Sequence, residues 1–365
     1  MTLNLSADAD RAPAPASQNV PSEFGPFAEG IDRLMSVEIN GRGVAIGLYE
    51  AARAKAAGPL AMGAAHLLRQ ALAANGAVVL IASGFPISPF FMPEQDGLIG
   101  AASLARSLVL AYGAKPVLLV NEADEAAASA SLIAAGLYCR SLDKALELPV
   151  TAAVVRFPSD PDAAKRLAQD LIEQTAPRAF VAIERPGANE HGHYHSGGGL
   201  RLTDHCGRID LLVPMLRAGG IPTIAIGDGG NELGCDVIRE DVLRVVPNAT
   251  RCVCPCEGTL VPTTAVDLLV MASISNWGAY AIEACLAALE RRPELLHSGA
   301  VDARIHEACA MAMANNGAPN LLDPGSDAVP LHVHAGFLDM AAFMVSSAAL
   351  DAGRYYRKPR YPWLR

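Results

Sequence analysis

The amino-acid sequence predicts an α/β protein with a mostly parallel sheet, helices on both faces and extra helices at both ends. Three observations predict this fold. From about residue 77, short apolar runs alternate with helical stretches. The apolar runs lack the alternation of a half-exposed strand, as expected for strands that are covered on both faces. A series of strand–helix–strand units also joins parallel strands by right-handed crossovers.

Six apolar runs are the predicted strands, and helical patterns follow several of them. The strand runs are residues 77–83, 116–120, 151–157, 179–183, 222–226 and 266–274. The helical patterns are residues 97–113, 161–174 and 276–292, with further helices in 26–76, 299–316 and 335–350. No Ser/Gly linker divides the chain. We therefore expect a mobile N-terminal arm over residues 1–25 and a single compact catalytic domain over 26–365.

Composition excludes several classes of protein. The 365 residues are 51% hydrophobic and 18% charged, which suits a large globular core and not a disordered chain. The net charge of −9 argues against a nucleic-acid partner, because phosphate backbones are bound by clustered Lys and Arg. No apolar run is long enough to cross a membrane, and the N-terminus lacks the apolar region of a secretory signal. We expect a cytoplasmic protein, and a homo-oligomer is compatible with the sequence.

The eight cysteines are scattered and do not form a disulfide framework. Three of them stand in the segment CVCPC, as Cys252, Cys254 and Cys256. Strand-like alternation would place these thiols on one face, and their spacing differs from the two-residue gap of zinc knuckles. We interpret them as small buried hydrophobic residues in preference to a metal or redox site.

Polar motifs follow four of the predicted strands. Ligands bind beyond the carboxyl ends of the strands in open α/β sheets, so all four motifs are expected to face one crevice. In order along the chain they are GFPISPFFMPEQDGLIG, ERPG, GDGGNELG and SNWGAY. This convergence predicts the site at the carboxyl ends of the strands.

GDGGNELG carries the densest set of polar residues. Gly229 and Gly230 expose backbone N–H groups and allow positive φ, which suits close contact with a substrate. Asp228, Asn231 and Glu232 supply hard oxygen ligands of the kind that Mg²⁺ or Mn²⁺ prefers. A tight turn that tolerates polar residues is the alternative. The segment is neither a P-loop nor a dinucleotide fingerprint, so no nucleotide cofactor is expected.

PEQDG and ERPG add carboxylates on either side. Asp96 precedes a helix, where a structural N-cap is the simple interpretation, and Gly97 leaves the first helical turn open to an anionic ligand. Glu94 is not needed for a cap, so it is a candidate base and metal ligand. Glu184 stands at a strand end beside Arg185, either as half of a surface ion pair or, if buried, as a candidate base.

SNWG and a histidine-rich loop complete the motifs. Ser275 or Asn276 is expected to cap the helix that follows and to present an amide and N–H groups to an anion. In NEHGHYHSGGG (189–199), three alternating histidines could chelate a softer metal. We favour a mobile loop over the crevice instead, with one histidine or Tyr194 contacting substrate.

Together these motifs resemble the D-glutamate cyclase family. The resemblance rests on IAIGDGGNELG with ERPG upstream and SNWGAY downstream, and on GFP and PEQDG in the first loop, over about residues 75–290. Gln95 replaces a Thr, and NNGAPNLLDPGSD lacks the acidic Asp-Gly pattern expected there. Carried over residue by residue, the resemblance implicates Glu94, Asp96, Glu184, Asp228, Asn231, Glu232 and Asn276, with Gly192 and Tyr194 as the G-x-Y loop.

The resemblance implies a hydro-lyase that converts D-glutamate to 5-oxo-D-proline and water in an α/β fold, with a divalent metal in the crevice. A metal held by Asp228 and its neighbours would polarise the side-chain carboxylate. Glu184 or Glu94 would move the proton, and the N–H groups of Gly97 and Asn276 would hold the α-carboxylate. Two alternatives stay open: a metal-dependent hydrolase or phosphoryl-transfer enzyme, and a non-catalytic amino-acid sensor.

Overall fold

The structure is a computed structural model that describes residues 24–317 and 319–348, so most of the expected N-terminal arm lies outside the described residues. Seven strands form one sheet, and every adjacent pair is parallel. They are β1 (Val78–Ala82), β4 (Lys115–Val120), β5 (Tyr138–Cys139), β6 (Thr151–Arg156), β7 (Ala179–Ile183), β8 (Thr223–Gly227) and β9 (Leu268–Met271). The predicted fold class is confirmed, and each of the six predicted strands overlaps a strand of this sheet.

The strand order is β5-β6-β4-β1-β7-β8-β9. The chain runs from β1 outward through β4, returns across the sheet, and resumes at β7 on the other side of β1. The connections after β1 and β7 therefore lead in opposite directions, which opens a crevice beyond their carboxyl ends. Residues of β1, β7 and β8 are buried throughout, which explains their continuous apolar runs.

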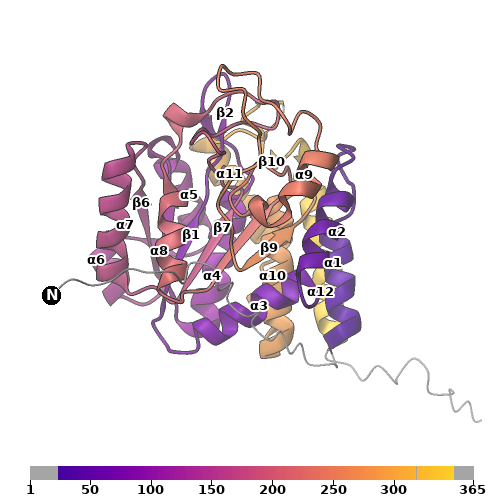
Figure 1. Ribbon diagram of the computed structural model, residues 1–365. Coiled ribbons are helices and arrows are strands. Elements are labelled where there is room, and N and C mark those ends of the chain that lie inside the picture. The colour runs from indigo at the N-terminus through magenta and orange to yellow at the C-terminus, as the bar shows by residue number, and fades with distance from the viewer. Residues whose placement is uncertain (1–23, 318, 349–365) are drawn as a thin grey trace, which may run out of the picture.

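Helices cover both faces of the sheet (Figure 1). In the described residues they are α1 (Gly25–Met35), α2 (Ala45–Lys55), α3 (Leu60–Ala71), α4 (Leu98–Tyr112), α5 (Glu125–Ala134), α6 (Leu142–Glu147), α7 (Pro161–Thr175), α8 (Leu212–Ala218), α9 (Arg239–Val245), α10 (Ser275–Glu290), α11 (Gly299–Met311) and α12 (Leu331–Ala348). Helices α4, α5 and α10 pack on one face, and α6, α7 and α8 cover the other. Helices α1, α2 and α12 extend the molecule beyond β9, and they lie in the segments near the two ends where helices were predicted.

Two short antiparallel pairs stand at the carboxyl edge of the sheet. One joins β2 (Pro86–Ile87) to β3 (Met92–Pro93), and the other joins β10 (Gly325–Ser326) to β11 (Val329–Pro330). The backbone of Glu94 forms an isolated parallel bridge with Asn315, which brings the loop after β1 next to the segment before β10. The C-terminal segment therefore contributes to the same edge as the central strands.

The CVCPC segment is not a strand. Residues 251–258 run through bends and turns, and Cys254 and Cys256 are only half-buried. The expectation that alternation would place the thiols on one strand face was therefore wrong. Pro255 and the turn at residues 255–256 prevent the segment from pairing as a strand. The thiols are brought together by the turn described below.

Candidate active site

Carboxyl side chains from four separate segments meet at the carboxyl edge of the sheet. We call them the carboxylate cluster: Glu94, Asp96, Glu184, Asp228, Glu232 and Asp327. Oxygens of Asp96, Asp228 and Asp327 lie within 4.8 Å of one another, and so do those of Glu184, Asp228 and Glu232. Three of the four strand-end motifs thus supply acids to the cluster, and Asp228 is common to both groups of three.

Asp96 and Asn276 cap each other's helices. Asp96 accepts hydrogen bonds from the backbone N–H groups of Ser275 (2.9 Å) and Asn276 (2.8 Å) at the start of α10. In return, Asn276 Oδ1 accepts from the N–H groups of Gly97 (2.9 Å) and Gly100 (2.7 Å) at the start of α4. The simple capping interpretation of Asp96 is right in kind, but the helix that it caps is α10 instead of its own.

This exchange changes the role of Gly97. Its N–H and that of Asn276 are already bonded, so the expectation that they hold a substrate carboxylate is not supported. Gly97 has φ +80°, and a Cβ there would lie 2.6 Å from Cβ of Glu184 and 2.7 Å from Oγ of Ser83. Glycine is therefore required here because Glu184 and Ser83 approach the backbone closely.

Glu184 is held in place by its backbone and by Ser275. It follows the last residue of β7 with φ +44°, in the left-handed region that non-glycine residues rarely adopt. Its Oε2 accepts a hydrogen bond of 2.7 Å from the Ser275 hydroxyl. Ser275 therefore orients a buried carboxyl group, which leaves Oε1 of Glu184 for other chemistry.

Glu232 closes the GDGGNELG loop upon itself. Its carboxylate accepts from the backbone N–H groups of Asp228 (3.1 Å), Gly229 (2.6 Å) and Gly230 (2.7 Å). The two glycine N–H groups predicted to contact a substrate are therefore used within the loop. Asn231 donates its amide to the backbone carbonyl of His195, at 2.9 Å. The expected ligands Asn231 and Glu232 thus also hold the loop that carries Asp228.

Two residues of the site were missed by the sequence reasoning. Arg42, between α1 and α2, contacts Asp228 Oδ1 (3.1 Å), and its other nitrogen donates to the carbonyl of Ser273 (2.7 Å). It also lies 3.7 Å from Asp327, in the turn between β10 and β11. Asp327 belongs to the NNGAPNLLDPGSD stretch, which supplies an acid after all, although not as Asp-Gly. Neither residue follows a strand of the main sheet, which was the signal used to find the others.

Burial and mutual repulsion raise pKa values within the cluster. Burial raises the pKa of Asp96 to about 8, and the charge of Asp228 adds to the shift. The pKa values of Glu94, Glu184 and Asp327 are also well above their ordinary values, first through burial and then through neighbouring carboxylates. Arg42 offsets only part of the negative charge.

The carboxylate cluster fits a divalent cation. Asp228 Oδ2 and Asp327 Oδ2 are buried and have no hydrogen-bond partner, although a buried carboxylate oxygen normally has one. They belong to the group of three aspartates whose oxygens lie within 4.8 Å. Oxygen ligands of this number and charge suit Mg²⁺ or Mn²⁺.

Tyr194 does not serve as predicted. Its side chain is fully buried and its hydroxyl donates to Asp210, while the ring packs in a small separate core with Phe85 and Leu202. The hydroxyl is therefore not free for a substrate, and we remove Tyr194 from the expected contacts. Its role is to anchor the loop after β7.

The histidines of that loop separate. His191 is exposed, His193 is half-buried and lies 3.3 Å from the hydroxyl of Thr203, and His195 is buried. They do not meet as a three-histidine metal site.

Arg185 is not part of a surface ion pair. It is 1% exposed and donates to the carbonyl of Gly84 (3.0 Å) and to Asn121 Oδ1 (2.6 Å). Its hydrogen bonds lead to the loops after β1 and β4 and to the carbonyl of Gly207, and not to Glu184. Arg185 therefore ties the loops after β1, β4 and β7 together beside the site, and Glu184 is left to the cluster.

A family model described as D-glutamate cyclase-like, C-terminal, matches residues 31–341. The chain belongs to the D-glutamate cyclase-like family. The human protein named D-glutamate cyclase, mitochondrial, is 28% identical over 231 residues, which are 60% of this chain and 34% of the human protein. The chain thus spans about a third of the length of that relative.

The part of the chain that matches the D-glutamate cyclase-like family contains the whole carboxylate cluster. One acid of the cluster, Asp327, and its neighbour Arg42 lie inside the matched residues but outside the span of about residues 75–290 on which the resemblance rested. The family match therefore extends to the two segments that complete the site. Among the described residues, no helix has the length and apolar character needed to cross a membrane.

Proposed function

We propose that this protein interconverts D-glutamate and 5-oxo-D-proline plus water, with a divalent cation held in the carboxylate cluster. The observation that carries the proposal is the pair of buried oxygens on Asp228 and Asp327 that have no hydrogen-bond partner and lie among converging carboxyl groups. Membership of the D-glutamate cyclase-like family and the printed name of the human relative support the choice of substrate.

The reaction sets definite demands on the site. The amine nitrogen of glutamate forms a bond to the δ-carbon, and one C–O bond at that carbon breaks. The nitrogen begins as an ammonium group and gives up two protons, and the departing oxygen leaves with both as water. The protein must therefore move protons from nitrogen to oxygen and stabilise negative charge on the carboxylate that is attacked.

Glu184 is our choice for the group that moves these protons. Its pKa is raised well above the ordinary value, first by burial and then by Asp228, which brings it closer to that of an ammonium group. The Ser275 hydroxyl fixes one oxygen and leaves the other available. Glu94 is the second candidate, since its pKa is also raised, chiefly by burial, so that it holds a proton to give to the leaving oxygen.

Arg42 is our choice for the group that holds the α-carboxylate. Its guanidinium group faces the cluster and a third of its side chain is exposed. A planar guanidinium can bind a carboxylate with two parallel hydrogen bonds. We choose Arg42 over the backbone N–H groups of Gly97 and Asn276 because each of those has a single hydrogen, already bonded within the protein. Each terminal nitrogen of Arg42, in contrast, has a second N–H besides the one that meets Asp228 or Ser273.

Asp96, Asp228 and Asp327 would hold the cation, with Glu232 supporting the loop of Asp228. When bound, the cation supplies Lewis-acid polarisation of the carboxylate that is attacked. The residues themselves bind the substrate, keep it folded for cyclisation and carry the protons, and proximity alone can contribute several kcal/mol to an intramolecular reaction of this kind.

The test is direct. Purified protein is incubated with D-glutamate, L-glutamate and both enantiomers of 5-oxoproline, with Mn²⁺, Mg²⁺ or EDTA, and the products are separated by chiral chromatography. We expect exchange between D-glutamate and 5-oxo-D-proline that requires metal and is lost in Asp228→Asn. If the protein hydrolyses phosphate esters and does not cyclise glutamate, the proposal is wrong and the protein is a metal-dependent hydrolase. Tight binding of D-glutamate, recovered unchanged with or without metal, would replace it with a sensor.

A further inference from the structure

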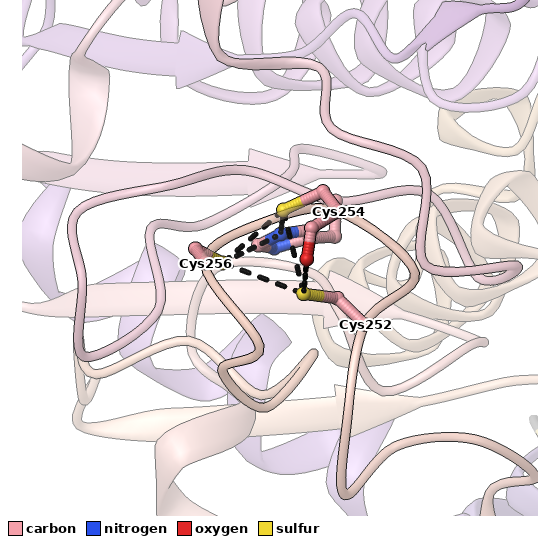
Figure 2. A group of neighbouring side chains, drawn as sticks. Cys252, Cys254 and Cys256 are labelled. Carbon is pink, nitrogen blue, oxygen red and sulfur yellow. Dashed lines mark hydrogen bonds between the residues drawn. The ribbon is translucent and has the colours of Figure 1, made fainter.

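A second group of candidate metal ligands lies apart from the carboxylate cluster. The thiols of Cys252, Cys254 and Cys256 point toward one another (Figure 2). Cys252 Sγ lies 3.4 Å from each of the other two sulfurs, and Cys254 Sγ lies 3.2 Å from Cys256 Sγ. The ring nitrogen Nε2 of His195 completes the group, at 3.3 Å from Cys254 Sγ and 3.5 Å from Cys256 Sγ.

These distances are close to those of a tetrahedral zinc site. With Zn–S bonds near 2.3 Å and Zn–N bonds near 2.0–2.1 Å, the corners of a tetrahedron lie roughly 3.8 Å apart for two sulfurs and roughly 3.5 Å for sulfur and nitrogen. All four ligand atoms lie within 4.8 Å of one another. A small outward movement of the thiols would therefore admit an ion at the centre.

We propose that Cys252, Cys254, Cys256 and His195 bind one structural Zn²⁺ ion. Three thiolates and one imidazole form a soft ligand set that selects zinc over the hard cations suited to the carboxylate cluster. Four protein ligands also leave no open position for a substrate, which is the mark of a structural site. This inference does not depend on the function proposed above.

The local backbone explains how thiols at i, i+2 and i+4 meet without a strand. A turn is closed by a hydrogen bond from the N–H of Glu257 to the carbonyl of Cys254 (3.2 Å), and the N–H of Cys252 donates to the carbonyl of Gly258 (2.8 Å). Because of this turn, the three cysteine side chains lie on the same side of the loop, close to one another, instead of being spaced along a strand. A Cβ at Gly258 would lie 2.6 Å from the ring of His191, so glycine is needed for the two loops to meet.

Packing alone does not account for this arrangement. Small buried hydrophobic residues are surrounded by apolar side chains, whereas Cys254 and Cys256 are half-buried. All three cysteines carry free thiols, and the neighbour that joins them is an imidazole from a loop more than fifty positions away. A disulfide between two of them would leave the third thiol and His195 without a role.

The site would join two long loops and reach the carboxylate cluster. His195 belongs to the loop after β7, and the cysteines belong to the loop between α9 and β9. The N–H of Val253 donates to the carbonyl of Gly199 (3.2 Å), which holds the loops side by side. The carbonyl of His195 accepts from Asn231 (2.9 Å) in the GDGGNELG loop. A zinc ion here would fix the position of Asn231, three residues from Asp228.

The experiment measures zinc in the purified 365-residue chain, kept reduced and washed with a weak chelator. We expect one Zn²⁺ per chain by elemental analysis. After exchange for Co²⁺, we expect the near-ultraviolet absorption of thiolate–cobalt bonds. Cys256→Ser should lose most of the zinc. Cys139→Ser is the matched control, because Cys139 is also a half-buried free thiol but lies on β5.

Two further variants keep the proposal open to disproof. Asp228→Asn should retain its zinc, which shows that the ion is not in the carboxylate cluster. His195→Cys should retain zinc with four thiolates and a stronger cobalt absorption. The proposal is overturned if the wild-type chain holds no zinc and all three thiols react freely, if mass spectrometry shows a disulfide among them, or if Asp228→Asn and not Cys256→Ser removes the metal. These readouts are independent of cyclase activity.

Discussion

Asp228 is shared by both groups of oxygens in the carboxylate cluster and also contacts Arg42. Because it follows β8 directly, its backbone is fixed by the sheet and by the N–H groups that bind Glu232. After burial, the negative charge of Asp228 is the largest cause of the raised pKa values of Asp96 and Glu184. We therefore expect a substitution of the Asp228 side chain to change metal binding while leaving the fold intact.

We predict that Asp228→Asn weakens Mn²⁺ binding by more than about 100-fold, since the loss of an outer partner of a metal ligand alone lowers affinity 10- to 100-fold. The fold should persist, because an amide has the same shape and removes repulsion. Isothermal titration calorimetry measures the affinity and circular dichroism the fold. Unaltered affinity would remove Asp228 from the ligand set.

Glu184→Gln tests the proton-moving group. The amide keeps the hydrogen bond with Ser275 and the shape of the side chain but cannot take a proton. We predict that kcat falls by about 10²- to 10⁴-fold, the usual contribution of general acid–base catalysis, while KM changes little. Steady-state kinetics with D-glutamate and saturating Mn²⁺ measures both. A variant with full turnover would assign the task to another residue, with Glu94→Gln the next to examine.

At the residue scale, the sequence predicted the acids that follow strands. Glu184 and Asp228 directly follow the parallel strands β7 and β8, Glu94 lies in the long loop after β1, and the structure brings the three together. Arg42 and Asp327 could not be found in this way, because they come from a loop between helices and from a short hairpin. Only three-dimensional proximity identifies them.

At the scale of elements, the exchange of caps between α4 and α10 joins the two helices. A cap normally comes from the residue that precedes its own helix, so sequence rules look only a few positions away. Here Asp96 and Asn276 are 180 positions apart, and Asn276 also donates to the Ser326 hydroxyl of β10 at 2.9 Å. The expectation that Ser275 or Asn276 caps α10 was wrong, because Ser275 donates to Glu184 and Asn276 caps α4, which no local rule could show.

We predict that Asn276→Ala lowers the free energy of unfolding by about 1–3 kcal/mol, because two buried N–H groups at the start of α4 lose their acceptor. Asp160→Ala is the matched control, since Asp160 is an exposed cap that accepts from Ala163 at the start of α7. Urea unfolding measures both. Asn276→Ala should also lose activity, while Asp160→Ala keeps it. Equal effects on stability and activity in the two variants would contradict a special role for the exchanged caps.

The strands illustrate what period and composition can predict. β7 (Ala179–Ile183) matches its predicted bounds, because a fully buried strand has an uninterrupted apolar run. β5 (Tyr138–Cys139) was missed, since two residues at the edge of a sheet carry no such signal. The CVCPC segment was misread, because alternation cannot distinguish a strand from a turn that gathers every second side chain.

At the scale of the whole molecule, the negative charge of the site works against the fold. Asp96 has an ordinary pKa of 3.8 and a pKa of about 8 in the folded chain. A raised pKa means that the folded state binds the proton more tightly. The resulting stabilisation is complete below the unfolded pKa and is lost as pH rises through about 8.

We therefore predict that the metal-free chain melts at a lower temperature as pH rises from about 5 to 8, and that Mn²⁺ restores stability most at the upper end. Thermal unfolding with EDTA and with Mn²⁺ at three pH values measures the gap. The gap should be small in Asp228→Asn at every pH. A gap in the wild-type chain that shrinks toward pH 8 would show that the cluster is not the metal site.

The position of Asp327 in the chain has a consequence for synthesis. All seven strands of the main sheet are complete at Met271, but Asp327 is 56 residues later. As the polypeptide leaves the ribosome, the sheet can form while the proposed cation site still lacks one of its acids. A product that terminates early, after α10, would carry the parallel sheet and Asp228 yet lack the full ligand set. The proposed cation site would therefore be complete only after the segment that carries Asp327 has been translated.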